Sequence, residues 1–215
     1  MKIFLDSADV DAIRKAHDTG LLDGVTTNPT YIMKSGRKFA EVVAEICGIT
    51  PGPVSAEAMS DTAEGLVKEA RQISQIAPNV VVKIPMTVEG LKAVGILESE
   101  ENIRCNVTMV FSSTQAYLAM KAGATFVSIV LSRLDAVANE SYILAEDAVT
   151  VKNNYGFDAQ VLAGSLKTPN HILSCLRAGV DIATMPDTLF YQLFKHPLTD
   201  AGLSQFAKDW KTVPK

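Results

Sequence analysis

The sequence predicts an α/β protein that forms a single (β/α)8 barrel with a C-terminal amphipathic helix. Short β-rich runs alternate eight times with helical patterns, which is typical of parallel strands joined by helical crossovers. No GxGxxG motif follows any of these runs, which disfavours the alternative, an open doubly wound sheet. No linker or low-complexity segment interrupts the chain, so we expect residues 1–215 to form one domain.

The predicted strands are short and rich in β-branched residues. In chain order they lie at residues 2–6, 24–28, 53–59, 80–86, 104–111, 125–131, 160–166 and 181–186. The helical patterns that follow them lie at residues 9–17, 37–47, 62–76, 88–99, 113–123, 140–156, 169–179 and 187–196. A last helix is expected at about 199–213, because Leu203, Phe206 and Trp210 recur at i, i+3 and i+7 on one helical face.

Composition excludes several classes of protein. The chain has 215 residues, a net charge of −4 and a pI of about 5.4, which argues against a broad basic surface for nucleic acid. No apolar stretch approaches the roughly 18 residues that a membrane span needs, and the N-terminal "MKIFLDSADVD" lacks the apolar run of a signal peptide. We therefore expect a cytoplasmic protein that contacts neither nucleic acid nor membrane.

The cysteines and histidines give no sign of a metal site. Cys47, Cys105 and Cys175 are odd in number and far apart, so neither a disulfide framework nor a zinc site is indicated. The three histidines share no ligand spacing, and we interpret them as surface or structural residues.

Nearly every predicted strand carries a polar residue near its C-terminal end, where (β/α)8 barrels build their active sites. These residues are Asp6, Thr26, Asn28, Ser55, Glu57, Lys83, Asn106, Thr108, Ser128, Arg133, Ser165 and Lys167. Taken singly, each has a structural alternative: Asp6 can cap a helix, and Arg133 can pair with Asp135 on the surface. A polar ring at one height on most strands is not a requirement of packing, so we interpret it as an active site.

The segment "NVVVKIPMT", residues 79–87, places Lys83 in the middle of an apolar strand. With Val82 and Ile84 beside it, the amine loses hydration, which disfavours its charged form. A neutral amine is a nucleophile toward carbonyl carbons and forms a Schiff base with them. The structural alternative is a lysine that extends its stem along apolar surface and holds its amine in solvent.

Two carboxylates, Asp6 and Glu57, are expected in the same cavity as Lys83. They can act as general acid and base beside an iminium on that lysine. An iminium accepts the electron pair released when a neighbouring carbon–carbon bond breaks, so the pattern predicts class I aldolase chemistry, which needs neither a metal nor a cofactor.

The chain resembles the transaldolase family over nearly its whole length, in the small-subunit branch that also contains fructose-6-phosphate aldolases. The resemblance rests on "FLDSADVDAIR", "GPVSAEAMS", "NVTMVFSSTQAYLAMKAGATFVS", "NYGFDAQVLAGSLKTP" and "KHPLTDAGLSQFAKDW". Its most specific parts are "GVTTNP" and "VVKIPMT". Small members of this family tend to form rings, which implies a homo-oligomer of the pentamer or decamer type.

The resemblance implies a role for each catalytic residue. Lys83 is the Schiff-base lysine, and Asp6 moves a proton as the carbon–carbon bond breaks and forms. Glu57 and Thr108 hold the water that is used in making and hydrolysing the imine.

The resemblance also implies how the substrate is held. Asn28, Asn106 and Ser128 bind the hydroxyl groups of the dihydroxyacetone unit, and Thr26 lies on the same strand face as Asn28. The phosphate is held by Arg133, Ser165 and Lys167.

The sixth strand departs from the family pattern. The family usually has "SPFVGRLDDIG" where this chain has "SIVLSRLDAVANES", so Ile129, Val130 and Ser132 replace a proline, an aromatic residue and a glycine, and Ala136 replaces an aspartate. These changes make the apolar wall near the substrate smaller. Ser128 and Arg133 are retained.

The same positions favour one activity over another. The family's aldolases have a tyrosine where this chain has Val130 and a glutamine where it has Glu57. We therefore expect a transaldolase of the pentose phosphate pathway, which moves dihydroxyacetone from sedoheptulose 7-phosphate to glyceraldehyde 3-phosphate. Two alternatives stay open: a fructose-6-phosphate aldolase, and a barrel that binds sugar phosphates with little turnover.

Overall fold

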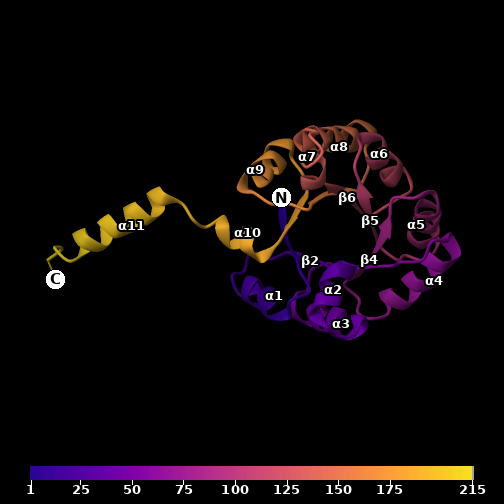
Figure 1. Ribbon diagram of the computed structural model, residues 1–215, viewed down its shortest axis with the longest axis horizontal. Helices are drawn as coiled ribbons and strands as arrows, with labels where there is room; N and C mark the ends of the chain where they lie inside the picture. The colour runs from indigo at the N-terminus through magenta and orange to yellow at the C-terminus, as the bar shows by residue number, and fades with distance from the viewer. Residues whose placement is uncertain (215) are drawn as a thin grey trace.

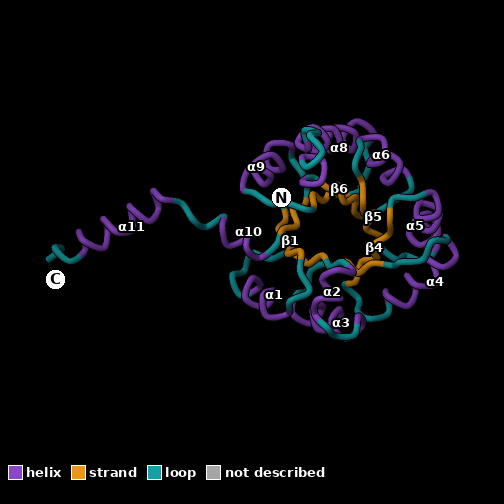
Figure 2. Tube along the Cα trace, in the orientation of Figure 1, coloured by secondary structure: helices purple, strands orange, loops and turns teal. Residues whose placement is uncertain are grey.

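Eight parallel strands close into a barrel, as the sequence predicts. The computed structural model describes residues 1–214, and its strands pair in chain order, with the first also paired to the last. They are β1 (Lys2–Asp6), β2 (Gly24–Thr26), β3 (Val54–Glu57), β4 (Val80–Pro85), β5 (Cys105–Val110), β6 (Phe126–Val130), β7 (Gln160–Gly164) and β8 (Ile182–Met185). Figure 2 shows this ring of strands inside a ring of helices.

Helices follow the strands and cover the outside of the barrel (Figure 1). The outer helices are α1 (Val10–His17), α3 (Phe39–Ile49), α4 (Ala63–Ser74), α5 (Val88–Glu100), α6 (Ser113–Lys121), α8 (Ser141–Tyr155), α9 (Pro169–Ala178) and α10 (Asp187–Gln192). Most begin at a side chain that caps them. For example, Asp9 accepts hydrogen bonds from two backbone amides of α1, and Thr87 accepts one from Gly90 at the start of α5.

Two short helices that the sequence analysis did not predict follow β2 and β6: α2 (Pro29–Ser35) and α7 (Ser132–Asp135). The second strand therefore ends at Thr26 instead of residue 28, because Asn28 already caps α2 by accepting a hydrogen bond from the amide of Tyr31 at 3.0 Å. Proline at the first helical position fits this start.

The barrel is filled by a small inner cluster, separate from the larger core between strands and helices. This inner cluster consists of Phe4, Val81, Phe126, Leu162 and Ile182. On a strand, residues two apart face the same side. The residues two positions later on the first, fourth and sixth strands are Asp6, Lys83 and Ser128, so the cluster forms the apolar base on which these polar side chains lie.

The C-terminal helix α11 (Pro197–Trp210) leaves the barrel and extends away from it (Figure 1). None of its residues is buried, and Leu198, Phe206 and Trp210 are 70–76% exposed. Its bounds differ by two to three residues from the predicted helix at 199–213, with Pro197 at the first turn. Among residues 1–214, no helix combines the length and the apolar character that a bilayer crossing requires.

Candidate active site

A cavity of about 440 Å³ opens at the carboxyl ends of the strands. All of the predicted catalytic and substrate-binding residues line it except Asn106. They are Asp6, Thr26, Asn28, Glu57, Lys83, Thr108, Ser128, Arg133, Ser165 and Lys167. They come from seven of the eight strands or the segments that follow them, which is how a barrel brings distant parts of the chain together.

Lys83 lies at the base of this cavity with its amine turned toward β3. Its Nζ donates to Oε2 of Glu57 at 3.0 Å and to the carbonyl oxygen of Thr27 at 3.3 Å. Register explains the first contact, because Glu57 and Lys83 are paired neighbours on β3 and β4. The two side chains are only 15% and 13% exposed. The amine is therefore held inside the cavity instead of extending into solvent.

Asp6 is partly buried at the end of β1, two strands away from Glu57 on β3. Its Oδ1 accepts from the hydroxyl of Thr26 at 2.9 Å, and that hydroxyl also lies 2.7 Å from Oγ1 of Thr184. Burial raises the pKa of the Asp6 carboxyl above its ordinary value of 3.8, although Lys83 and the Thr26 hydrogen bond act in the opposite direction. A carboxyl group with a raised pKa is suited to both giving and taking a proton.

A buried hydrogen-bonded chain supports the base of the cavity. The hydroxyl of Ser128 donates to Oδ1 of Asn106 at 2.6 Å, and Nδ2 of Asn106 donates to Oγ of Ser55 at 3.0 Å. Asn106 and Ser55 are fully buried, so they lie behind the cavity wall. Asn106 therefore contacts Ser128 from behind the cavity wall.

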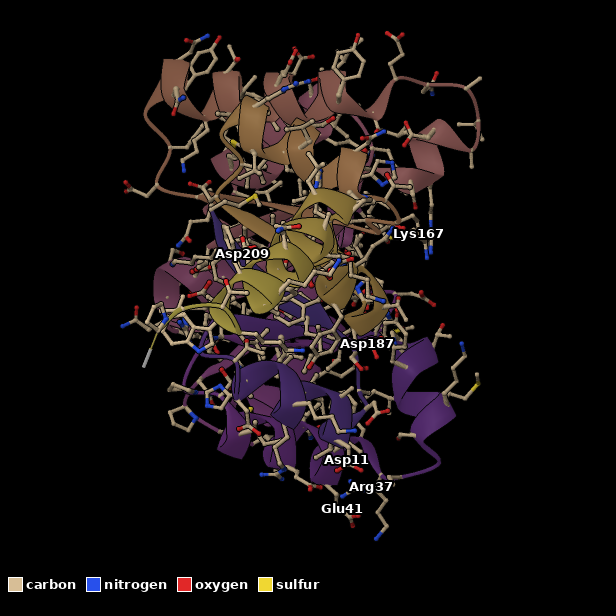
Figure 3. The ribbon with its side chains drawn as sticks, turned by 90° about the vertical axis from the view of Figure 1, so that its left-hand side faces the viewer. Asp11, Arg37, Glu41, Lys167, Asp187 and Asp209 are labelled. Atoms are coloured by element: carbon tan, nitrogen blue, oxygen red, sulfur yellow. The ribbon has the colours of Figure 1, made fainter. Side chains whose placement is uncertain are left out.

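Cationic side chains enter the cavity from the segments after β6 and β7. Arg133 and Lys167 both line it, and Ser165 lies between the end of β7 and Lys167. Arg133 does not pair with Asp135, which instead contacts His171 at 2.8 Å. In Figure 3, Lys167, which lines the cavity, and Asp187 both lie to the right of the centre of the view.

Several residues that line the cavity were not predicted from the sequence, and four of them are polar: Thr30, Tyr31, Lys34 and Thr184. Tyr31 and Lys34 are three residues apart on α2 and so share a helical face. Burial raises the pKa of the Tyr31 hydroxyl, with additional effects of Asp6 and Asp187, so this hydroxyl stays protonated and can donate. Recognising "NPT" as a helix start would have indicated this face.

The backbone is unusual at two positions of the cavity wall. Met109 and Ser165 have positive φ angles of 63° and 58°. Met109 lies where the pairing of β5 with β6 shifts register, and its Sδ is 3.7 Å from Nη1 of Arg133. Residues other than glycine adopt this backbone region uncommonly, and such positions cluster at functional sites.

A closed (β/α)8 barrel with a lysine and two carboxylates in the cavity at the carboxyl ends of its strands has the make-up of an aldolase-type enzyme. The family model described as "Transaldolase/Fructose-6-phosphate aldolase" matches residues 3–215. The chain is 54% identical to a "Probable transaldolase" of Aquifex aeolicus, over 100% of this chain and 99% of that one. It is 50% identical to a "Probable transaldolase" of Geobacter metallireducens over the full length of both. The chain belongs to the transaldolase/fructose-6-phosphate aldolase family, and it is a transferase with an aldolase-type mechanism.

Solved structures of other enzymes share the fold. Inosine 5' monophosphate dehydrogenase from Legionella pneumophila matches with a TM-score of 0.61 and 13% identity, covering 88% of this chain and 58% of that one. Thiamine phosphate pyrophosphorylase from Pyrococcus furiosus matches with a TM-score of 0.58 and 14% identity, covering 86% of this chain and 85% of that one. At such low identity, these similarities concern the barrel alone.

Proposed function

We propose that this protein is a transaldolase that moves a dihydroxyacetone unit through a Schiff base on Lys83. The donor is a ketose phosphate such as sedoheptulose 7-phosphate, and the acceptor is glyceraldehyde 3-phosphate. The products are erythrose 4-phosphate and fructose 6-phosphate. The observation that carries this proposal is the position of the Lys83 amine inside the cavity, 3.0 Å from the Glu57 carboxylate.

The first half of the reaction forms the imine and breaks the donor. The amine of Lys83 attacks the ketone carbon, and loss of water gives an iminium. Glu57 takes up the proton that the amine releases and, with Thr108, holds the departing water; both line the cavity. The Asp6 carboxylate then removes the proton of the C4 hydroxyl. The C3–C4 bond breaks, its electron pair enters the iminium to give an enamine, and the aldose phosphate leaves.

The second half reverses these steps on a new acceptor. The enamine carbon attacks the aldehyde carbon of glyceraldehyde 3-phosphate, and Asp6 returns its proton to the oxygen that becomes the new C4 hydroxyl. Water then adds to the iminium and releases fructose 6-phosphate and the free amine. The raised pKa of Asp6 suits this role, because the same carboxyl must take and give a proton within one cycle.

Binding is assigned to the polar side chains around this centre. Asn28, Thr26 and Ser128 line the cavity near Lys83 and are proposed to hold the hydroxyl groups of the dihydroxyacetone unit, with Asn106 behind Ser128. Arg133, Ser165 and Lys167 are proposed to hold the phosphate, which suits two cations and a hydroxyl.

We also infer a place in the cell and an assembly. The pentose phosphate pathway and the cytoplasm fit a sugar-phosphate enzyme of this family. A homo-oligomer of the ring type, a pentamer or decamer, would give the exposed apolar side chains of α11 a partner. The mass of the purified protein in solution, measured by light scattering, tests this assembly: a monomer would contradict it.

The reaction itself is tested by following both possible fates of the donor. Incubation with fructose 6-phosphate and erythrose 4-phosphate is expected to give sedoheptulose 7-phosphate and glyceraldehyde 3-phosphate. Fructose 6-phosphate alone is expected to release little free dihydroxyacetone. Free dihydroxyacetone as the main product would instead establish fructose-6-phosphate aldolase activity, and binding of sugar phosphates without either product would establish a non-catalytic barrel.

A further inference from the structure

A single imidazole connects the two segments that carry the cations of the cavity. Nδ1 of His171 accepts a hydrogen bond from the backbone amide of Lys167 at 3.0 Å, and its Nε2 lies 2.8 Å from Oδ2 of Asp135. Lys167 follows β7, whereas Asp135 ends α7 after β6, only two residues beyond Arg133. His171 itself is on the first turn of α9.

The hydrogen-bond partners fix the tautomer of this ring. Because Nδ1 accepts from an amide, the proton of the neutral imidazole is on Nε2, which donates to Asp135. Asp135 is itself anchored, since its Oδ1 accepts from the amide of Ser141 at 3.1 Å. Burial acts to raise the pKa of Asp135, but the hydrogen bonds from Ser141 and His171 outweigh it and hold the pKa below its ordinary value.

A second connection joins the same two segments nearer to the cavity. The hydroxyl groups of Ser132 and Ser165 lie 2.7 Å apart, and the amide of Leu131 donates to the carbonyl oxygen of Gly164 at 3.1 Å. Ser165 has a positive φ of 58°, which requires support from its surroundings. The segments after β6 and β7 are therefore tied on the cavity side by serines and on the outer side by His171.

We propose that His171 is a positioning residue that clamps the segments after β6 and β7 together, so that Arg133, Ser165 and Lys167 converge on one phosphate group. The inference rests on the proposed function, which assigns the phosphate to these three residues. Helix capping alone explains the contact with Lys167, because the side chain of a residue in the first turn often accepts from an amide before the helix. It does not explain the contact with Asp135, which belongs to another element.

Three substitutions separate these two roles. His171→Ala removes both contacts. Asp135→Asn keeps the acceptor for Ser141 but places an amide donor against the Nε2 proton, so it breaks only the contact between segments. His171→Gln carries an acceptor and a donor on one side chain and is expected to restore part of the clamp.

His196→Ala is the matched control, because Nδ1 of His196 also accepts a hydrogen bond from a backbone amide at the start of a helix, at 3.2 Å. Its helix α11 extends away from the barrel and contributes no residue to the cavity lining. Thermal unfolding of each variant shows whether it is folded.

The first measurement is the Kd of inorganic phosphate, obtained by titration calorimetry on the full chain. His171→Ala and Asp135→Asn are expected to weaken phosphate binding by roughly 10-fold. This is at the low end of the 10- to 150-fold loss expected for removing a charge-assisted hydrogen bond, because the cations remain but are less well placed. The phosphate affinity of His171→Gln is expected to lie between that of His171→Ala and that of the wild type. The affinity of His196→Ala is expected to match that of the wild type.

The second measurement compares acceptors. In His171→Ala and Asp135→Asn, KM for glyceraldehyde 3-phosphate is expected to rise with little change in kcat. The reaction with unphosphorylated glyceraldehyde is expected to stay nearly unchanged. Equal losses on both acceptors, or wild-type phosphate affinity in folded His171→Ala, would overturn the clamp. A wild type without transfer activity would overturn the proposed function, whereas the phosphate titration would still decide the clamp, because it does not depend on turnover.

Discussion

The base and the rim of the cavity are built in different ways. The base consists of Asp6, Glu57 and Lys83, which belong to β1, β3 and β4. The rim consists of α2, α7 and the segment that runs from Ser165 to Lys167, all of which lie outside the strands. Base side chains are fixed by strand register and by the inner cluster beneath them. Rim side chains depend on short helices, a positive φ angle and hydrogen bonds between segments.

This difference indicates that the base and the rim have different roles in the reaction. The base holds the amine and the two carboxyl groups, so we expect changes there to abolish turnover whatever the substrate. The rim holds the cations and Tyr31, so we expect changes there to alter which substrates are accepted.

Lys83→Met has the largest expected effect. Methionine keeps a similar length and apolar stem but cannot form an imine, so transfer activity should fall to background on every donor and acceptor. The barrel should still fold, because the inner cluster and the strand register are unchanged; circular dichroism checks this. Residual activity near the wild-type level would show that another group forms the covalent bond.

Asp6→Asn is expected to lower kcat by about 10²- to 10⁴-fold, the usual contribution of a general acid–base group.

The same substitution is expected to increase the stability of the folded protein at neutral pH. The folded-state pKa of Asp6 is raised, so the folded state binds more protons than the unfolded state between the ordinary value of 3.8 and the raised value. The free energy of unfolding of the wild type therefore falls as pH rises through this window. Asparagine does not titrate, so this loss of stability is absent from Asp6→Asn.

Urea unfolding at about pH 4 and about pH 7 tests the stability of this variant against the wild type. Asp6→Asn should be the more stable protein at neutral pH, and its advantage should shrink in acid. A variant that is less stable at neutral pH would mean that ionised Asp6 stabilises the fold, contrary to the burial that raises its pKa.

Arg133→Ala tests the rim with an intermediate effect. It should raise KM for glyceraldehyde 3-phosphate and scarcely change the reaction with unphosphorylated glyceraldehyde, so discrimination between them should fall by roughly 10- to 150-fold. Arg177→Ala, an exposed arginine on α9, is the control. Equal loss on both acceptors would assign Arg133 to structure and remove it from the rim's recognition role.

Tyr31→Phe has the smallest expected effect. It removes one hydroxyl from the only aromatic residue that lines the cavity within the described part of the chain. A neutral hydrogen bond contributes about 0.5–1.5 kcal/mol, so kcat/KM for the phosphorylated acceptor should fall by roughly 2- to 13-fold. Tyr142→Phe, which changes an exposed tyrosine on α8, serves as the control. Unchanged kinetics in Tyr31→Phe would show that α2 only covers the cavity.

The base of the cavity could be predicted from the sequence, and the rim only in part. Alternation along strands is enough to place Lys83 and Glu57 on the inner face, and parallel pairing brings them together. Nothing in the local pattern gives the positive φ of Ser165, whose hydroxyl contacts Ser132, a residue 33 positions away in the chain. His171 was interpreted as surface or structural, since its partner Asp135 becomes visible only when the segments after β6 and β7 are adjacent.

Reductive trapping shows directly whether Lys83 forms the covalent bond with the substrate. The protein is incubated with fructose 6-phosphate and borohydride, and the modified peptide is sequenced by mass spectrometry. We expect one reduced dihydroxyacetone adduct on Lys83 in the wild type, and none in Lys83→Met. An unchanged mass for the wild type, or an adduct on another lysine such as Lys34 or Lys167 of the same cavity, would contradict it.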